Sequence, residues 1–356
     1  MDSATNEQRA HQALYRKYRP SVFDHVRGQE PVVSVLRAAV EQGKIAHAYL
    51  FAGGRGTGKT SMARILAHAV GTSDNDIYEM DAASNRGIDE IRELRDSVAT
   101  LPFASTYKFY IIDEAHALTP QAWQALLKTL EEPPSHVVFV LATTELEKVP
   151  DTILSRCQTF RFAKPAQEVL VQLVLDVAKK EGVAISRPGA EIIALMGDGS
   201  FRDTLGILQK VLTLSADNTL AEEEIARVVG APTSGMVNEL LLALAAKDLA
   251  HALALLNSAV AQGVEAKVFV LLLVAKVRTI LLLRFSPQLK NQIAAQYNAA
   301  DSAILADLAG SKGAAVNSRL LAELITALLE ITRAPLPIVP LELALYRVFG
   351  VDSVTK

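Results

Sequence analysis

The sequence predicts an α/β domain built on a parallel sheet, followed by two regions made only of helices. The first observation is a set of short apolar runs that end in small or polar residues: HAYLFAG, KFYIIDEAH and HVVFVLATT. Buried parallel strands have this pattern, with functional residues at their carboxyl ends. The second is that helical patterns alternate with these runs, as over 61–69 and 120–130, which favours a doubly wound sheet. The third is that the strand pattern fades after Pro165.

The change of pattern also predicts the domain boundaries. We expect a polar tail over 1–10, an α/β core over 11–165, a small helical domain over 166–230 and a longer helical domain over 231–356. The APTSG stretch has the composition of a linker between the two helical domains. Leu and Ala with helical spacing dominate the chain beyond it.

Composition excludes several classes of protein. The formal net charge is -3 with 21% charged residues, so the chain is not a globally basic nucleic-acid binder. The single cysteine, Cys157, allows no intrachain disulfide and no cysteine-based zinc site, which fits a reducing cytoplasm. The first ten residues lack the apolar core of a signal peptide. The most apolar segment, VFVLLLVA, is far shorter than the ~20 residues that a membrane span needs, so we expect no membrane association.

The segment GGRGTGKT, over 53–60, predicts a phosphate-binding loop. It fits G-x-x-x-x-G-K-[ST] at every position, and it stands between a strand pattern and a helical pattern, as this motif requires. Backbone N–H groups and the helix N-terminus would face the phosphates. Lys59 would neutralise them, and Thr60 would offer its hydroxyl to Mg²⁺. The alternative is a glycine turn with no ligand. The predicted nucleotide-binding residues here are Gly53, Gly54, Arg55, Gly56, Thr57, Gly58, Lys59, Thr60 and Ser61.

Polar residues at the ends of the next two strand patterns predict the catalytic groups. Asp113 can hold the hydration shell of Mg²⁺, and Glu114 can orient and polarise the attacking water. Thr144 can reach the γ-phosphate or that water, although threonines also simply favour strands. We expect His116 to be a packing or solvated histidine rather than a metal ligand.

Several segments together resemble the bacterial DNA polymerase III gamma/tau family, whose members are AAA+ ATPases of the replicative sliding-clamp loader. The resemblance covers about 14–214 and rests on YRKYRP, FDHVRGQE, HAYLFAGGRGTGKT, DAASNRGIDEIREL, IIDEAHALTPQAWQALLKTLEEPP, LATTELEKVPDTILSRCQTF and GDGSFRDTLGILQK. It implies an AAA+ P-loop NTPase core with a parallel sheet, then a small helical lid, then an all-α collar that oligomerises. It also implies ATP and Mg²⁺ as ligands.

The resemblance implies roles for further residues and a set of partners. Arg202 in GSFRD matches the lid arginine that senses the γ-phosphate of the same chain, and Arg156 in SRC matches the arginine finger that reaches a neighbouring subunit's ATP. Both could instead be surface arginines paired with an acid. The implied partners are other loader subunits in a ring-like pentamer, the sliding clamp and primer–template DNA read without sequence preference. The implied adenine-pocket residues are Tyr15, Arg16 and Tyr18.

Arg86 and Arg92 stand in the segment that faces DNA in the resembling family. Contacts from these arginines to phosphates would be independent of sequence. A solvated helix face with Glu partners explains them about as well.

The chain departs from the family pattern in two places. Family members carry a four-cysteine zinc module before the DAAS segment, whereas AHAVGTSDNDIYEMDAAS holds no cysteine, so we expect no zinc site. The long tau-type extension is also missing, so we expect either a gamma-like form or a truncated chain.

Two other functions compete with a loader ATPase. A non-hydrolysing loader subunit would contribute only an arginine finger, but it would have no need of the intact loop and the Asp113–Glu114 pair. A different AAA+ motor, such as a branch-migration helicase, is disfavoured by the SRC segment and the wholly helical C-terminal third.

Overall fold

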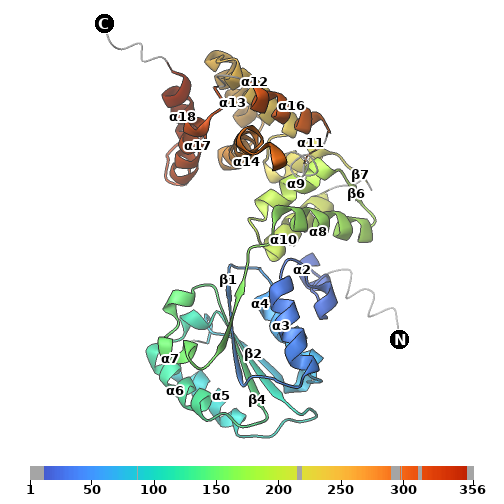
Figure 1. The fold of residues 1–356 in the computed structure, drawn as a ribbon, viewed down its shortest axis with the longest axis vertical. Coiled ribbons are helices and arrows are strands. Elements are labelled where there is room, and N and C mark those ends of the chain that lie inside the picture. The colour runs from blue at the N-terminus through green and yellow to red at the C-terminus, as the bar shows by residue number, and fades with distance from the viewer. Residues whose placement is uncertain are drawn as a thin grey trace. The chain divides into compact units, whose positions relative to one another are not determined.

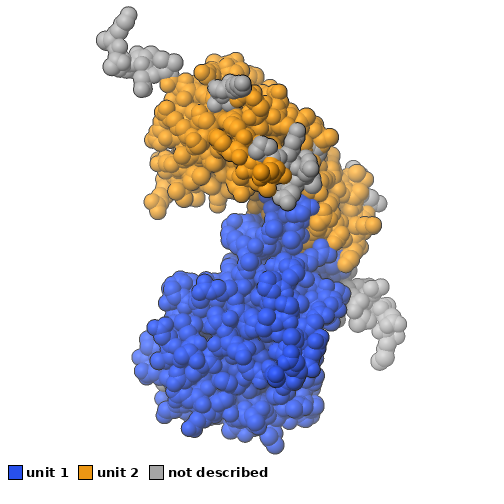
Figure 2. Space-filling view, viewed as in Figure 1, with its two compact units in different colours: residues 1–170, 197–206 blue, residues 171–196, 207–356 orange. Residues whose placement is uncertain are grey.

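The computed structural model describes residues 12–85, 87–214, 219–289, 297, 299–311 and 315–350 (Figure 1). The predicted polar tail over 1–10 and the predicted DNA contact Arg86 lie outside this set. The chain divides into two compact units, coloured separately in Figure 2. Unit 1 takes residues 1–170 and 197–206, and unit 2 takes residues 171–196 and 207–356.

Unit 1 is built on a five-stranded parallel sheet, as the sequence predicts. Its strands are β1 (Ala48–Gly53), β2 (Ile77–Asp81), β3 (Lys108–Asp113), β4 (Val137–Thr143) and β5 (Gln158–Phe162), in the order β2-β3-β4-β1-β5. The three apolar runs of the sequence are β1, β3 and β4, the inner strands. The edge strands β2 and β5 are half-exposed. Their mixed polarity explains why no apolar run marks them in the sequence.

Alternate residues of the inner strands build a core on each face of the sheet, because successive side chains point to opposite sides. In β3, Phe109 and Ile111 pack with helices α3 (Glu30–Glu41) and α4 (Lys59–Ala69). Tyr110 and Ile112 pack on the other face. The helices there are α5 (Ile88–Val98), α6 (Pro120–Glu131) and α7 (Asp151–Leu154), so the sheet lies between two helical layers (Figure 1).

The register of the sheet brings several polar strand ends to one edge. Ala52 of β1 is paired with Thr143 of β4, and Asp113 of β3 with Asp81 of β2. Since β4 lies between β1 and β3, the residues that follow these three strands are neighbours. Around this edge lie four short elements: α2 (Leu14–Lys17), η3 (Ala115–Ala117), η4 (Leu146–Lys148) and the start of α10 (Phe201–Leu214). The other short elements of unit 1 are η1 (Phe23–His25) and η2 (Asp74–Asp76).

The regular structure in the described part of unit 2 is helical apart from the two-residue strands β6 (Ala184–Ile185) and β7 (Thr219–Leu220). A single apolar cluster extends from α12 to α18. Among the described residues no single helix is long and apolar enough to cross a membrane, although α11 and α12 would pass together by length and composition as a bent pair. The described helices of unit 2 are α8 (Gln167–Lys180, begun in unit 1), α9 (Arg187–Met196), α10 (also begun in unit 1), α11 (Glu222–Val229), α12 (Ser234–Ala245), α13 (Leu249–Ala261), α14 (Ala266–Phe285), η5 (Pro287–Leu289), α16 (Ala299–Gly310), α17 (Ser318–Glu330) and α18 (Val339–Phe349).

A buried ion pair joins three helices of unit 2. Lys276 of α14 and Asp301 of α16 lie 3.3 Å apart, with 4% and 3% of each residue exposed. Lys276 Nζ also donates to Ser234 Oγ and Asn238 Oδ1 of α12 at 2.6 Å. The hydroxyl of Ser234 in turn donates to the Asp301 carboxylate. Both charges therefore have partners inside the chain, which is the condition for a charge to be buried at tolerable cost.

Candidate active site

The loop between β1 and α4 has a backbone that requires glycine. Gly56 and Gly58 have φ of +68° and +102°, in the left-handed region that L side chains rarely adopt. A Cβ on Gly56 would also collide with the Ser200 hydroxyl. The loop ends at Lys59, the first residue of α4, so the N-terminus of this helix faces the loop. Oriented N–H groups at a helix N-terminus suit a phosphate group.

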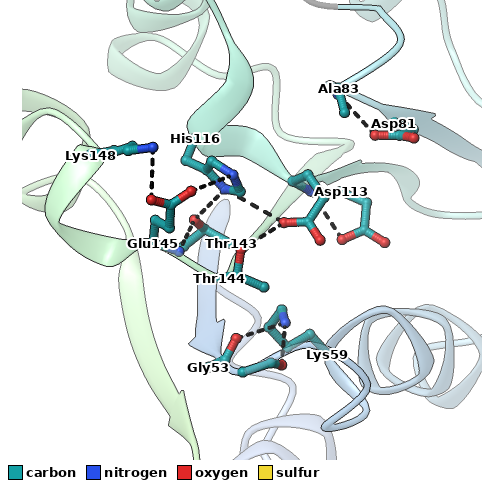
Figure 3. Close-up of polar contacts among 12 residues, drawn as sticks. Gly53, Lys59, Asp81, Ala83, Asp113, His116, Thr143, Thr144, Glu145 and Lys148 are labelled. Atoms are coloured by element: carbon teal, nitrogen blue, oxygen red, sulfur yellow. Dashed lines mark hydrogen bonds and ion pairs between the residues drawn. The ribbon is translucent and has the colours of Figure 1, made fainter. Parts of the chain in front are cut away.

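Lys59 is buried beside this loop, with only 5% of the residue exposed. Its Nζ donates to the carbonyl oxygens of Gly53 and Gly54, each at 2.8 Å (Figure 3). Burial lowers the pKa of Lys59, the carboxylates of Glu114 and Asp113 oppose that effect, and Arg202 adds to it. Neutral carbonyls compensate a buried ammonium only in part, so an anion at this position would be strongly favoured.

Thr60 and Asp113 come together as a hydroxyl–carboxylate pair. Thr60 Oγ1 donates to Asp113 Oδ2 at 2.7 Å, across 53 residues of sequence. No group of three or more His, Cys, Asp or Glu able to hold a metal was found among the described residues. Mg²⁺ does not need one, because it keeps several waters and binds through one or two carboxylates plus substrate phosphates. The pair therefore fits a Mg²⁺ that arrives with a nucleotide.

Glu114 follows β3 in a strained backbone conformation, with φ +49°. Non-glycine residues in this region are uncommon and concentrate at functional sites. Its N–H donates to Asp113 Oδ1 at 3.0 Å, and Thr144 Oγ1 donates to its Oε2 at 3.0 Å (Figure 3). The structure thus brings together Lys59, Asp113, Glu114 and Thr144, four residues that the sequence singles out.

Two arginines also lie near this edge of the sheet. The Arg202 guanidinium lies 6.0 Å from the centre of the Tyr15 ring, so the predicted lid arginine and one of the predicted adenine-pocket residues are neighbours. Arg19 Nε donates to Ser61 Oγ at 3.0 Å. Burial is the main cause that lowers the pKa of Arg19, followed by the nearby Arg64, while Glu79 and, less strongly, Asp113 act in the opposite direction.

Arg19 was missed in the sequence, although it stands inside the YRKYRP segment that carries the resemblance. Of the other predicted adenine-pocket residues, the Arg16 guanidinium lies 5.8 Å from the Tyr15 ring centre and the Lys17 ammonium lies 5.5 Å from that of Tyr18. Periodicity and motif spacing do not indicate that Arg19 lies beside the phosphate-binding loop, because its contact with Ser61 spans 42 residues of sequence.

Gln29 was also missed in the sequence. Its side-chain amide donates to the carbonyl of Ala163 at 2.8 Å and accepts from the Ala163 N–H at 3.3 Å. The same amide donates to the carbonyl of Thr57 at 3.4 Å. Gln29 is 3% exposed and fixes the loop against the segment after β5. Its only signal in the sequence is its place in the FDHVRGQE segment.

Arg156 is held by its own chain. Its guanidinium lies 2.7 Å from Glu131 Oε1 at the end of α6 and donates to the carbonyl of Thr152 at 2.8 Å. The side chain is 34% exposed and its partner 43%. A pair this exposed contributes little free energy, so a more strongly charged partner could displace Glu131.

Two remaining residues have simple surroundings. Arg92 pairs with Asp89 one helical turn away at 3.1 Å, on an exposed face of α5. Its predicted contact with DNA stays a prediction.

Cys157 is partly buried, and burial raises the pKa of its thiol to about 12. The thiol therefore stays protonated near neutral pH and is a poor nucleophile.

Protein-family models match both halves of the chain. A model described as "DNA polymerase III, delta subunit" matches residues 28–86 and 71–166. A model described as "DNA polymerase III subunits gamma and tau domain III" matches residues 220–356.

Curated relatives extend this match. The chain is 40% identical over 302 residues to DNA polymerase III subunit tau of Bacillus subtilis, covering 79% of this chain and 54% of the relative. It is 34% identical over 308 residues to DNA polymerase III subunit tau of Escherichia coli, covering 80% and 48%. The chain thus spans about half the length of these relatives.

A solved structure agrees on the fold. The RuvB Holliday junction branch migration motor of Thermotoga maritima superposes with a TM-score of 0.51 at 22% identity, over 64% of this chain and 79% of that one. At this identity the likeness concerns the fold alone, and it agrees with the P-loop fold expected from the sequence.

Proposed function

This chain belongs to the DNA polymerase III gamma and tau subunit family, and we propose that it is the ATP-hydrolysing subunit of a bacterial clamp loader. The observation that carries the proposal is the meeting of Lys59, the Thr60–Asp113 pair and Glu114 at one edge of the sheet. A subunit that served only as a scaffold would not need this combination. A helicase-type motor is disfavoured because the family match continues through the helical C-terminal third.

The loop and its lysine would bind the phosphates of ATP. N–H groups at the start of α4 point at the phosphates, and Lys59 exchanges its two carbonyl partners for phosphate oxygens. Arg19 and Arg202 add positive charge at the same edge. A bound Mg²⁺, held through Thr60 and Asp113, would neutralise charge on the β- and γ-phosphates.

Glu114 and Thr144 would act on the attacking water. The water oxygen bonds to the γ-phosphorus while the bond from that phosphorus to the β–γ bridging oxygen breaks, giving ADP and inorganic phosphate. Glu114 accepts the proton that the water loses. Thr144, now hydrogen-bonded to Glu114, orients the water or the γ-phosphate.

Arg156 would complete the site of a neighbouring subunit. A guanidinium that reaches the γ-phosphate across an interface stabilises the charge of phosphoryl transfer. It would exchange the Glu131 carboxylate for that phosphate, so hydrolysis would be efficient only in an assembled ring.

The partners follow from the family and remain part of the proposal. We propose a ring-like pentamer joined through the helices of the C-terminal region, acting in the cytoplasm on the sliding clamp and on primer–template DNA. Arg86 and Arg92 would contact the DNA backbone without regard to sequence. ATP binding and hydrolysis would time the opening and release of the clamp.

ATPase measurements on the purified chain test the proposal. The chain is mixed with the other loader subunits and assayed alone, with clamp, with primed DNA and with both. We expect the largest rate with both present. An absence of hydrolysis in every mixture would leave a non-hydrolysing loader subunit as the better description.

A further inference from the structure

His116 lies beside the proposed general base, in a position to which the proposed function gives no role. Its Nδ1 lies 3.1 Å from Thr143 Oγ1 and 3.5 Å from Glu114 Oε2, and its Nε2 lies 3.1 Å from Glu145 Oε1 (Figure 3). The side chain is only 15% exposed. The ring is therefore mostly buried, and it lies against polar groups from two strand ends.

These contacts favour one ring nitrogen as a donor. A carboxylate can only accept, so a proton on Nε2 suits its 3.1 Å contact with Glu145 Oε1. Thr143 Oγ1 accepts the N–H of Glu145 at 3.0 Å, which leaves its own proton for Nδ1 when the ring is neutral. When the ring is charged, Nδ1–H points toward Thr143 and Glu114 instead. Nδ1 therefore reaches the Glu114 carboxylate as a donor only when the ring is charged.

The carboxylate of Glu114 is held through one oxygen. Thr144 donates to Oε2, and the same Oε2 is the atom nearest to His116. Because Oε2 already has these two neighbours, Oε1 is the oxygen that is left to take a proton from water. The strained φ of Glu114 makes such support necessary, because a strained conformation persists only when its surroundings fix it.

The far side of the ring connects to the segment that carries Arg156. Glu145 shares its two oxygens between His116 and Lys148, with Lys148 Nζ at 2.7 Å from Oε2. The hydrogen bond from Lys148 is the largest cause that lowers the pKa of Glu145. Glu145 directly precedes η4 and Lys148 is its last residue, and η4 is followed by α7 and then by Arg156.

From this geometry we infer that His116 is a positioning residue, which orients the Glu114 carboxylate and ties it through Glu145 to the segment leading to Arg156. The inference rests on the proposed function, because it takes Glu114 as the general base. A nucleotide-dependent change at Glu114 would then be felt at Glu145, and through η4 and α7 at the arginine presented to the neighbouring subunit.

Steady-state kinetics of the assembled loader, with clamp and primed DNA, test the inference. We expect His116→Leu to lower kcat roughly tenfold, since general-base catalysis as a whole accelerates a reaction by about 10²–10⁴-fold. The Kd for ATP, measured with a fluorescent analogue, should change less than about twofold. His116→Gln, which keeps a donor and an acceptor, should recover part of the rate.

A double-mutant cycle separates positioning from mere stability. In a Glu114→Gln background, His116→Leu should have no further effect on the residual rate. The matched control is His136→Leu, whose ring bonds to the carbonyls of Val98 and Thr100, and which should change the melting temperature but not kcat.

Several outcomes would overturn the inference. These are an unchanged kcat in His116→Leu, or a full additional loss in the Glu114→Gln background, while the wild-type loader hydrolyses ATP. A wild-type loader that does not hydrolyse ATP would instead overturn the proposed function and, with it, this inference.

Discussion

A buried lysine of unit 1, Lys59, and a buried lysine of unit 2, Lys276, show how similar burial can serve different ends. Lys59 and Lys276 are 5% and 4% exposed, and burial lowers the pKa of both. Lys276 is paired with Asp301 and donates further hydrogen bonds to Ser234 and Asn238. Lys59 donates to two neutral carbonyls at the mouth of a glycine loop.

The difference teaches that burial of a charge does not by itself identify a functional site. The ammonium of Lys276 is compensated inside the fold by a carboxylate, so it contributes to the arrangement of α12, α14 and α16. The partners of Lys59 compensate its charge in part, and the remainder is available to a phosphate. Binding of an external anion is therefore the expected use of Lys59.

Two arginines repeat the contrast. Arg284 in unit 2 donates to the backbone carbonyls of Leu308, Ala309 and Val316, at 2.8 to 3.2 Å. Two of these carbonyls belong to the last turn of α16, which has acceptors without partners inside the helix. Arg156 in unit 1 is held by a half-exposed glutamate. The first arrangement stabilises the fold, and the second can be released.

The largest effect is expected for Arg156→Ala. Turnover in the assembled loader should fall roughly 1,000-fold, the lower end of what an arginine finger supplies. The Kd for ATP of the variant chain should hardly change, because Arg156 serves a neighbour's site. Loss of ATP binding by the variant chain itself would contradict action across an interface. Arg284→Ala is the control and should lower the melting temperature without a change in turnover of the folded complex.

The next largest effect is expected for Lys276→Met, and it is an effect on stability. Removing Lys276 takes the cation out of a buried ion pair and costs about 3 kcal/mol of unfolding free energy. For a unit of this size the melting temperature should fall by roughly 6–12 °C. Lys276→Met combined with Asp301→Leu should recover part of the loss. A melting temperature equal to that of the wild type would show that this pair does not hold the three helices together.

In contrast to Lys276→Met, Lys59→Met should weaken ATP binding without lowering stability. ATP binding should weaken roughly 100-fold, which corresponds to the loss of a strong charge-assisted hydrogen bond. The melting temperature without nucleotide should stay the same or rise, because an ammonium whose hydrogen-bond partners are neutral carbonyls is removed from the interior. A destabilisation as large as that of Lys276→Met would remove the distinction between the two lysines.

The smallest effect is expected for Asp76, a buried charge of unit 1 that is satisfied within its own chain. Burial alone would raise the pKa of Asp76, but the N–H groups of Ala104 and Phe103 and the hydroxyls of Ser105 and Ser73 lower it, to about 2. A carboxyl with a lowered pKa stabilises the fold above its ordinary pKa of ~3.9. That stabilisation is lost as the pH falls from about 4 toward about 2.

Denaturant unfolding between pH 7 and pH 2 checks this behaviour. At pH 7, Asp76→Asn should lower the melting temperature by roughly 5 °C, through weaker hydrogen bonds to the backbone. The difference in stability between wild type and variant should shrink below pH 4. ATP turnover of the folded variant should be unchanged, and a fall in turnover would place Asp76 with the residues that act on ligands.

Local sequence alone determined the inner strands, the glycine loop and the acidic strand end. The signals for β1, β3 and β4 are apolar runs, and the loop is encoded by glycines at fixed spacing before Lys59. These features depend on neighbouring residues only, through side-chain period and backbone freedom. Arg156 and Arg202 were named from the family resemblance, since an arginine carries no local signal of its role.

The tertiary structure alone decided which polar groups meet. Arg19 reaches Ser61 across 42 residues, His116 meets Thr143 across 27, and Lys276 meets Asp301 across 25. No periodicity encodes such pairs, because they depend on strand order, register and the packing of helices that are distant in sequence. The edge strands β2 and β5 were decided in the same way, since their half-exposed faces do not require an apolar run. The sequence thus specifies the parts of the site, and the packing of the sheet determines the partners of each.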